Sequence, residues 1–386
     1  MDRLLSGKRF IFWPVGNGDS TTIPVTGDIV LQVDIRHLEC ANEEGDPHTP
    51  IVDVLVKELP RRGGKPYLAG FALTHPDTDH VQGFAELLKK VRIGELWFTP
   101  RVFREFKKDL GYDALAFKEE AMRRTALMIK HNGEVESGDR VRLIGYDELL
   151  SDEEFRGFPK KYLTVPGNWT TQIDRAFIPS DFGAFVHAPF KDDSAGERNE
   201  TSLAMQVNLI SGQSVTKALL FGDLSYPTIR RIFDTSKAAN NSGALEWNIL
   251  LAPHHCSKSV MYYRQNGDVE ELKQDILDDL EEAQREGGYI VSSSEPIPAD
   301  NNAGDNPPHA KAKARYQEIV YKEFLCTQEH GSEAAPVPIV FDHTDAGIQY
   351  TGPEGVESLA PDLAGAVAAA RGTDQPPQDK VGFGAA

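Results

Sequence analysis

The chain has 386 residues, of which 40% are hydrophobic, and a formal net charge of -18 at pH 7. This length and composition are enough for one large domain or two ordinary ones with a sizeable buried core. The acidic balance disfavours broad electrostatic attachment to nucleic acid or to an anionic membrane, because like charges repel each other over the whole surface.

Short basic clusters are the local exception to this acidity. They are Arg61-Arg62-Lys65, Lys89-Lys90-Arg92, Arg123-Arg124 and Arg230-Arg231. The clusters could join into a basic groove, or each could be an ordinary solvated face. No stretch of about 18 apolar residues and no signal-peptide core occurs, so we expect a soluble protein with no membrane attachment. The cysteines Cys40, Cys256 and Cys326 are widely spaced, which predicts neither a disulfide framework nor a thiolate zinc site and fits a reducing cytoplasm.

The first third of the chain reads as a β-meander followed by alternating helices and strands. Short strands are predicted at residues 10–15, 21–25 and 29–34, separated by glycine- and aspartate-containing turns. A helix is expected over 50–60, an apolar buried strand over 67–74, a helix over 81–88 and a strand over 93–98. Residues 104–131 are charged, amphipathic and mostly helical, which indicates an excursion from the sheet.

Strands return in the second part of the chain, at residues 140–144, 184–187, 202–207, 217–221, 247–251 and 289–292. An acidic helix is predicted over 268–286 and another over 309–320. From about residue 351 the chain is rich in glycine, alanine and proline, which is typical of a disordered tail. We therefore predict one domain over 1–350, with insertions at about 104–165 and 261–286, and a disordered tail over 351–386.

A cluster of metal-ligand side chains directly follows the apolar strand at 67–74. His75, Asp77, Asp79 and His80 lie within six residues of one another. Imidazoles suit zinc, manganese or iron, and the two carboxylates shift the preference towards harder ions such as manganese. The alternative is a capped loop, in which Asp79 begins the helix near Val81. So many donors in so short a segment favour a metal site.

Two further constellations also stand at the ends of apolar strands. Asp223 follows Gly222, and a glycine there permits close approach of the backbone, although Gly-Asp is also an ordinary turn. His254 and His255 follow the strand at 247–251. One of these histidines is expected to bind metal while the other orients water or substrate; the alternative is a buried pair satisfied by backbone.

The order of these segments resembles the metallo-β-lactamase fold superfamily, and more closely the soluble hydrolase domain of the DNA-uptake competence protein ComEC. The resemblance is carried by residues 15–20, 74–80, 221–223 and 253–255, and more weakly by 198–203 and 306–309. It covers roughly residues 8–345. It implies an α/β fold, a four-layer αββα sandwich with helical insertions and with ligands on loops at one edge of two packed sheets.

The resemblance also implies roles for particular residues. It places one metal on His75 and Asp77, completed by Asn199, and a second metal on Asp79, His80 and His254, with Asp223 bridging the two. The cofactors would then be two divalent ions, Mn²⁺ or Zn²⁺, and a metal-bridged hydroxide would attack the substrate. Asp79 is therefore also a catalytic residue, and His255 or His309 would donate a proton to the leaving group.

Four other residues are interpreted from their positions. Asp19 is interpreted as a turn residue of the opening hairpin, Asp34 as a group that supports a ligand, and His187 as a structural histidine. Cys256 stands where the ComEC-like domains have a glycine, and a cysteine there makes the loop less flexible.

The leading functional hypothesis is a phosphodiesterase or nuclease acting on DNA or RNA. One alternative keeps the metals and changes the substrate to a small phosphoester, a cyclic nucleotide, a lactone or an amide. Another is a non-catalytic, metal-containing protein that binds a protein partner through its helical insertion or tail. A fold alone does not decide among them.

Overall fold

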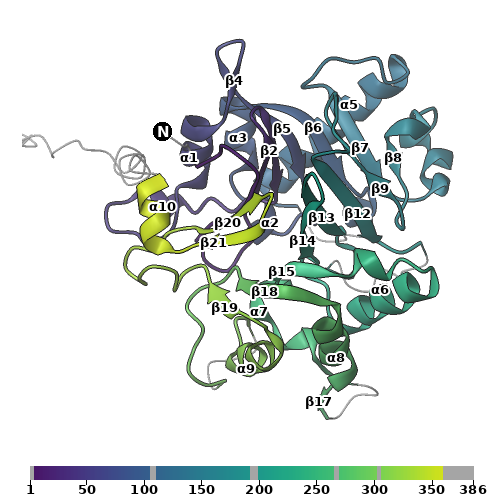
Figure 1. The fold of residues 1–386 in the computed structure, drawn as a ribbon. Helices are drawn as coiled ribbons and strands as arrows, with labels where there is room; N and C mark the ends of the chain where they lie inside the picture. Colours follow the sequence, from purple (N-terminus) through teal and green to yellow (C-terminus); the bar gives the residue numbers. More distant parts are fainter. Residues whose placement is uncertain (1–3, 105–109, 192–198, 265–268, 302–305, 360–386) are drawn as a thin grey trace, which may run out of the picture.

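The computed structural model describes residues 4–104, 110–191, 199–264, 269–301 and 306–359. These residues form two large β-sheets that pack face to face and are covered by helices on their outer faces (Figure 1).

The larger sheet has the strand order β21-β20-β1-β2-β3-β5-β6-β7-β8, with β4 paired to β5. Its β1 to β3 form the predicted antiparallel meander, while β3, β5, β6, β7 and β8 run parallel. The strands are β1 (Arg9–Phe12), β2 (Thr21–Thr26), β3 (Ile29–Val33), β4 (Arg61–Arg62), β5 (Lys65–Ala72), β6 (Arg92–Phe98), β7 (Arg140–Ile144), β8 (Leu163–Thr164), β20 (Ile339–Thr344) and β21 (Gly347–Thr351).

The smaller sheet has the order β19-β18-β15-β14-β13-β12-β9. Strands β12 to β14 are antiparallel, and β14, β15, β18 and β19 run parallel. The strands are β9 (Trp169–Thr170), β12 (Phe182–Ala188), β13 (Ala204–Ser211), β14 (Ser214–Leu220), β15 (Trp247–Leu251), β18 (Gln284–Ser292) and β19 (Glu323–Cys326). Two short ribbons complete the β structure, β10 (Gln172–Ile173) with β11 (Ala176–Phe177), and β16 (Tyr262–Tyr263) with β17 (Glu271–Leu272).

A hydrophobic core lies between the two sheets because alternate side chains of both point inwards. The larger sheet supplies Phe12, Leu31 and Trp97, and the smaller sheet supplies Phe182 and Met205, all nearly or fully buried. This packing fixes the two sheets relative to each other. The loops that follow their strands are thereby held in place.

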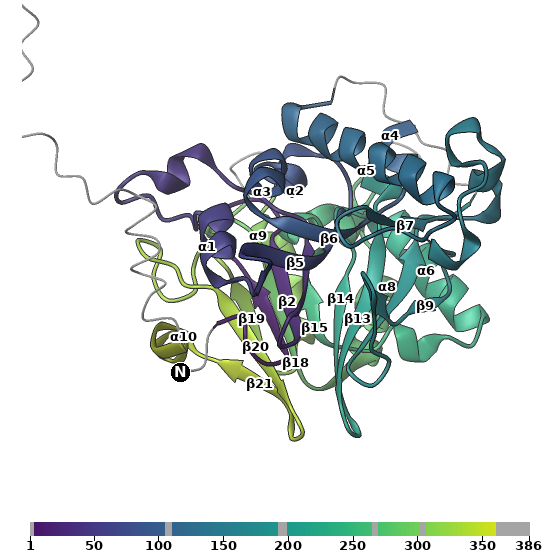
Figure 2. The same ribbon diagram turned by 90° about the horizontal axis from the view of Figure 1, so that it is seen from above.

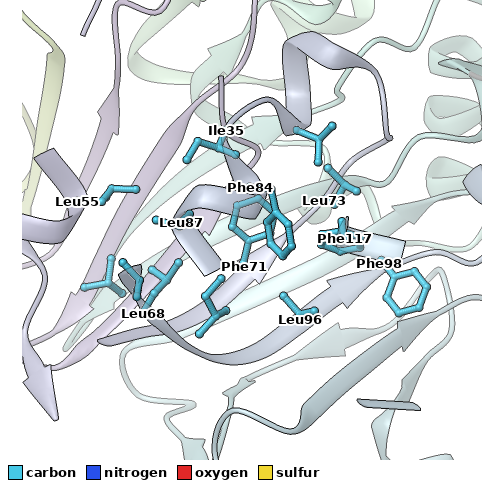
Figure 3. Close-up of a cluster of buried hydrophobic side chains, with 14 of the residues drawn as sticks. Ile35, Leu55, Leu68, Phe71, Leu73, Phe84, Leu87, Leu96, Phe98 and Phe117 are labelled. Carbon is cyan, nitrogen blue, oxygen red and sulfur yellow. The ribbon is translucent and has the colours of Figure 1, made fainter. Parts of the chain in front are cut away.

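A second core lies between the larger sheet and its helices, as Figure 3 shows for Leu55, Phe71, Phe84 and Phe117. The rings of Phe71 and Phe84 meet edge to face, with centroids 5.1 Å apart. The helices of this layer are α1 (Ile51–Glu58), α3 (Phe84–Lys90), α5 (Tyr112–Lys130) and α10 (Pro353–Leu359), with the short α2 (Thr78–Val81) and α4 (Arg101–Arg104) nearby.

A third core covers the opposite face of the smaller sheet. It is formed by α6 (Tyr226–Ala238), α8 (Gln274–Ala283) and α9 (Ala310–Ile319), which bury Phe233, Leu277 and Tyr316. Figure 1 shows these helices on the side of the molecule away from α1, α3 and α5, and Figure 2 gives the same elements seen from above. The order of layers is helix, sheet, sheet, helix, which confirms the predicted four-layer α/β sandwich.

Both predicted insertions turn out to be parts of these layers. Helix α5 buries Phe117 and Met128 against the larger sheet, and β7 and β8 extend that sheet, so the described part of 104–165 packs with the layers, and its status as an insertion stays a prediction. In the segment 261–286, α8 packs into the third core and β18 begins at Gln284. Amphipathic helices with a charged outer face look alike in sequence whether or not they cover a sheet.

The described chain continues past the boundary predicted for the tail at residue 351. Residues 353–359 form α10, and Val356 is fully buried in the core under the larger sheet. The remainder of the predicted tail, 360–386, lies outside the described residues. Within the described part of the chain, no helix combines the length and apolar character needed to cross a membrane.

Candidate metal centre

The candidate site lies where strand ends of both sheets meet. In the larger sheet, Asp34 follows β3 and His75 follows the parallel neighbour β5. In the smaller sheet, Asp223 follows β14, and His254 and His255 follow its parallel neighbour β15. Parallel neighbours end at the same edge of a sheet, so the fold itself brings these side chains together.

Asp34 sets the orientation of His80. It is fully buried, and its Oδ1 accepts a hydrogen bond from the backbone N–H of Thr74 at 2.7 Å. Its Oδ2 lies 2.8 Å from His80 Nδ1. When that nitrogen donates to Asp34, the lone pair of His80 Nε2 is directed into the cluster. Asp34 therefore holds the ring of His80 in place, and the role of His80 as a metal ligand stays a prediction.

Asp223 occupies the centre of the cluster. Its Oδ1 lies 3.1 Å from His80 Nε2, and its Oδ2 lies 3.6 Å from both His75 Nε2 and His254 Nε2. Gly222 makes this position accessible: its φ is +54°, and a Cβ there would lie 3.3 Å from Thr74 Cβ. Of the two interpretations left open for Gly-Asp, the turn and the close approach of the backbone, both describe Gly222.

The loop after β15 adopts a strained conformation. His254, His255 and Cys256 have φ values of 51°, 53° and 64°, the left-handed region that residues with a Cβ rarely enter. His255 is held in it by Nδ1, which lies 3.0 Å from the carbonyl oxygen of Ser293. Consecutive strained residues of this kind cluster at functional sites, where the surrounding structure enforces them.

Asp19 is the residue that the sequence reading missed. Interpreted as a turn residue, it is instead buried, with Oδ1 3.5 Å from His255 Nδ1 and Oδ2 3.9 Å from His80 Nδ1. Its backbone N–H donates to the carbonyl oxygen of Asp79 at 3.1 Å, which joins the opening hairpin to the histidine-aspartate segment. The signal in the sequence was a carboxylate immediately after Gly16-Asn17-Gly18.

Two overlapping groups could each hold a metal ion. In the first, ligand atoms of Asp19, His80, Asp223 and His255 all lie within 4.8 Å of one another, and in the second the same holds for His75, Asp79 and His80. The rings of His75 and His80 are 4.0 Å apart at their centroids. The structure thus brings His255, which the resemblance implied as a proton donor, among the ligand atoms of the first group.

Charges inside the cluster are strongly coupled. Burial alone would lower the pKa of His255, but the carboxylates of Asp223, Asp19 and Asp79 outweigh it and raise that pKa to about 10. Burial would raise the pKa of Asp223, but His80, His255 and His75 hold it well below its usual range. The cluster therefore needs positive charge among its carboxylates.

The donor set fits a divalent cation. Asp223 Oδ1 is buried without a hydrogen bond of good geometry, although His80 Nε2 is 3.1 Å away. A buried carboxylate oxygen in that state is stabilised by a cation. Mixed carboxylate and imidazole donors suit Zn²⁺ and Mn²⁺, and binding would displace the imidazole protons that now balance the charge.

The remaining predicted residues lie around this cluster. Asp77 Oδ2 is 3.8 Å from His75 Nε2, at the more exposed side of the site. His309 stands at the start of α9, and its Nδ1 accepts a hydrogen bond from the backbone N–H of Lys258 in the loop after His255. Asn199 lies in a 3-10 turn before β13, and within the described residues no side-chain hydrogen bond links it to the cluster.

His187 has a structural environment, as predicted. Its Nε2 lies 2.9 Å from the carbonyl oxygen of Ala244, and its Nδ1 lies 3.3 Å from Ser236 Oγ. Burial lowers the pKa of this imidazole to about 4, so it is neutral at physiological pH. It also borders a small cavity of about 90 Å³ between β12 and α6.

No protein-family model matches the chain, and no curated protein matches it in sequence. Similar solved structures include three metallo-β-lactamases. A B3 enzyme described as the first with an active-site glutamic acid has 15% identity over 66% of this chain and 77% of its own, with a TM-score of 0.34. The di-zinc class B3 enzyme LRA-12 from an Alaskan soil metagenome has 13% identity over 73% and 91%, with a TM-score of 0.31. BJP-1 of Bradyrhizobium japonicum has 13% identity over 72% and 91%, also at 0.31.

The TM-scores show that this chain superposes only in part on these structures. The four-layer architecture of this chain is established by its own sheets and helices. The closer resemblance to the ComEC domain stays a prediction.

Proposed function

We propose that the protein is a metal-dependent hydrolase of phosphodiesters. The observation that carries this proposal is the convergence of Asp19, His80, Asp223 and His255 from four separate segments into one buried cluster with ligand atoms within 4.8 Å. The additional carboxylates of Asp77 and Asp79 favour a harder ion such as Mn²⁺. Cations bound there would act as Lewis acids towards water and a substrate oxygen.

The side chains have distinct tasks in this proposal. Asp34 keeps His80 in the orientation that directs Nε2 inwards, because its carboxylate lies 2.8 Å from Nδ1. The side chains of Asp79 and His254 are 34% and 28% exposed, so they line the side from which a substrate enters. The Nδ1 of His309 accepts a backbone hydrogen bond, so the proton of the neutral ring is on Nε2, the atom that would donate to a leaving oxygen.

The substrate class depends on the basic clusters, and each of them contains at least one cation that is paired with an acidic neighbour. Lys90 pairs with Asp53 and Glu86 at 2.8 and 2.7 Å. Arg123 pairs with Glu120 and Asp139 at 2.7 and 2.8 Å.

Other basic side chains of these clusters also form ion pairs with carboxylates. Arg124 is buried and bonded to Glu120, Arg62 pairs with Asp28, and Arg230 pairs with Asp234 and Asp279. Pairs of this kind leave little charge for a polymeric backbone.

A small phosphodiester, such as a cyclic nucleotide, is therefore the favoured substrate, with polymeric DNA or RNA as the second candidate. A small substrate needs only the cluster and its immediate rim. A polymer needs several uncompensated cations along a track, since each phosphate contact contributes through counterion release.

The test combines metal content with a substrate panel. Purified protein is loaded with Mn²⁺ or Zn²⁺, and hydrolysis of bis(4-nitrophenyl) phosphate, cyclic nucleotides, DNA and RNA is measured. Asp223→Asn removes the central carboxylate charge at constant shape and should lower both metal occupancy and kcat/KM by at least tenfold. Asp181→Asn, at a half-buried carboxylate that pairs with Lys8 away from the cluster, is the matched control.

The outcomes separate the candidates. Turnover of small diesters without cleavage of DNA or RNA supports the first, and cleavage of polymers with a steep salt dependence would favour the second. Wild-type protein that binds no divalent metal, or an Asp223→Asn variant with unchanged turnover, contradicts the proposal.

A further inference from the structure

Arg36 carries a half-buried positive charge at the edge of the metal centre. It lies in the loop after β3, and its Nε and Nη1 atoms are buried with no hydrogen bond. Among the described residues, no carboxylate pairs with its guanidinium within the 4.0 Å of a salt bridge. A ligand that accepts hydrogen bonds from these nitrogens would stabilise them, because a desolvated and unpaired charge costs free energy.

Other arginines with a buried nitrogen that lacks a hydrogen bond differ from Arg36 in this respect. Arg140 lies 3.2 Å from Asp174, Arg142 lies 3.6 Å from Glu95, and Arg315 lies 2.7 Å from Glu318. Each of them has an acidic partner inside the protein. Within the described part of the chain, Arg36 is the arginine of this group that has no carboxylate within salt-bridge distance.

Gly18 creates the slot through which Arg36 reaches the metal centre. A Cβ at Gly18 would lie only 2.2 Å from Arg36 Cδ and 2.6 Å from the carbonyl oxygen of Asp79. The absent side chain thus lets the arm of Arg36 pass directly between the Asp19 loop and the Asp79 segment. Arg36 thus approaches the backbone of Asp79, whose side chain is 34% exposed and lines the more accessible side of the cluster.

The carboxylates nearest in electrostatic terms are already engaged. Burial lowers the pKa of Arg36, and the charges of Asp79 and Glu295 oppose that effect. Glu295 Oε1 lies 2.9 Å from His48 Nε2, and Asp79 Oδ2 lies 3.3 Å from His255 Nε2. Divalent cations would engage Asp79 further, which leaves the positive charge of Arg36 available to a ligand from solvent.

We propose that Arg36 is an anion-binding residue at the mouth of the metal centre, which holds a negatively charged phosphoryl oxygen of the substrate. The planar guanidinium presents several donors to such a group. This inference rests on the proposed phosphodiesterase function. It adds that the negatively charged oxygen of the bound substrate lies next to Gly18, where it meets Arg36.

The first experiment measures anion binding without turnover. Inorganic phosphate is titrated calorimetrically into metal-loaded wild type, Arg36→Met, Arg36→Lys and the control Arg175→Met, an exposed arginine paired with Glu136. Removal of the charge at Arg36 should raise the Kd for phosphate at least tenfold. Arg36→Lys should lie between, and Arg175→Met should match wild type with equal metal content throughout.

The second experiment separates substrate charge from chemistry. Steady-state rates are measured with anionic bis(4-nitrophenyl) phosphate and with neutral 4-nitrophenyl acetate. Arg36→Met should raise KM for the anionic ester at least tenfold with a smaller change in kcat, and leave the neutral ester unaffected.

Equal phosphate affinity in wild type and Arg36→Met overturns the inference, and so does a parallel loss of metal in Arg36→Met and Arg36→Lys, which would mark a structural counter-ion of Asp79. If wild type hydrolyses neither ester, the proposed function fails instead. The phosphate titration, run on the protein as purified, then still decides the role of Arg36.

Discussion

Gly18 controls how closely two parts of the metal centre approach each other. The atom nearest to its missing side chain, apart from the flexible Arg36, is a backbone oxygen of Asp79, which cannot move without its helix. Gly18→Ala should therefore displace Asp79 and weaken metal binding 10- to 100-fold, and overpacking should lower the free energy of unfolding by about 1–3 kcal/mol.

Gly27→Ala is the matched control, since a Cβ there meets nothing within 4 Å and the residue has no positive φ. Metal affinity is measured by competition with a chelator and stability by denaturant unfolding. Equal metal affinities for the two variants would show that the slot at Gly18 is not needed.

His187 should make the free energy of unfolding fall as the pH is lowered. Its pKa falls from 6.5 to about 4 on folding, so the unfolded chain binds the extra proton between these values. The stabilising contribution is therefore complete above pH 6.5 and is lost as the pH falls towards 4. Between pH 7.5 and 5 the loss amounts to about 2 kcal/mol.

His187→Gln should flatten the acid limb of a plot of unfolding free energy against pH by that amount, even if it lowers stability at pH 8. His131→Gln, at an exposed histidine, serves as reference and should leave the acid limb as in wild type. The assignment is wrong if both variants keep the same slope.

Individual residues of the cluster were predictable where they follow an apolar strand within a few residues. His75, His80, Asp223 and His255 satisfy this rule, and all of them enter the cluster. Asp19 could not be recognised in this way, because a carboxylate after Gly-Asn-Gly is equally typical of a turn. What distinguishes it is contact with His255, which is 236 positions away in the sequence (255 − 19) and becomes adjacent only in the folded chain.

At the level of secondary structure elements, α10 shows how a short helix can complete a layer. Val356 is its fully buried residue in the core under the larger sheet. Val356→Ala should lower the free energy of unfolding by about 2 kcal/mol, from lost burial and the cavity left behind. Glu354→Ala, at an exposed position of the same helix, should change stability little.

Chemical denaturation of both variants measures this difference. If Val356→Ala unfolds with the same midpoint as Glu354→Ala, α10 contributes nothing to the fold. The sequence indicated disorder here because alanine, glycine and proline dominate the following residues. One valine on a single helical turn is too weak a signal to reverse that composition.

The central strands were easier to predict than the outer layers. Strands such as β5 and β15 are buried on both faces and read as nearly continuous apolar runs. Helix α5 carries charges on its outer face and was interpreted as an excursion, although it buries Phe117 and Met128. Amphipathicity reveals that a helix has an apolar face, but not which sheet that face covers.

At the level of the whole molecule, the metal centre joins the two sheets. Asp19, His75 and His80 belong to the larger sheet and its loops, and Asp223 and His255 to the smaller. A cation bound by both halves should therefore stabilise the entire fold. At a free metal concentration 100 times the Kd, the gain is about 2.7 kcal/mol, or a rise of a few degrees in Tm.

Calorimetric melting with and without excess chelator measures this effect, and a non-chelating salt of equal ionic strength is the reference. Asp223→Asn should melt at the same temperature in both conditions, since it lacks the bridge. A wild-type Tm that is insensitive to metal removal would contradict a centre shared by the sheets.

The pairing of β1 with β20 has a consequence for the order of events during synthesis. Arg9 faces Asp342 across this pair, so the first strand meets its outer neighbour only after most of the chain has left the ribosome. Until then the edge of the meander offers unpaired backbone groups to any other strand. The edge of β1 is therefore open to mispairing for most of the time that the chain is being translated. We expect a chaperone, or a strand of another chain, to bind the nascent protein at this edge.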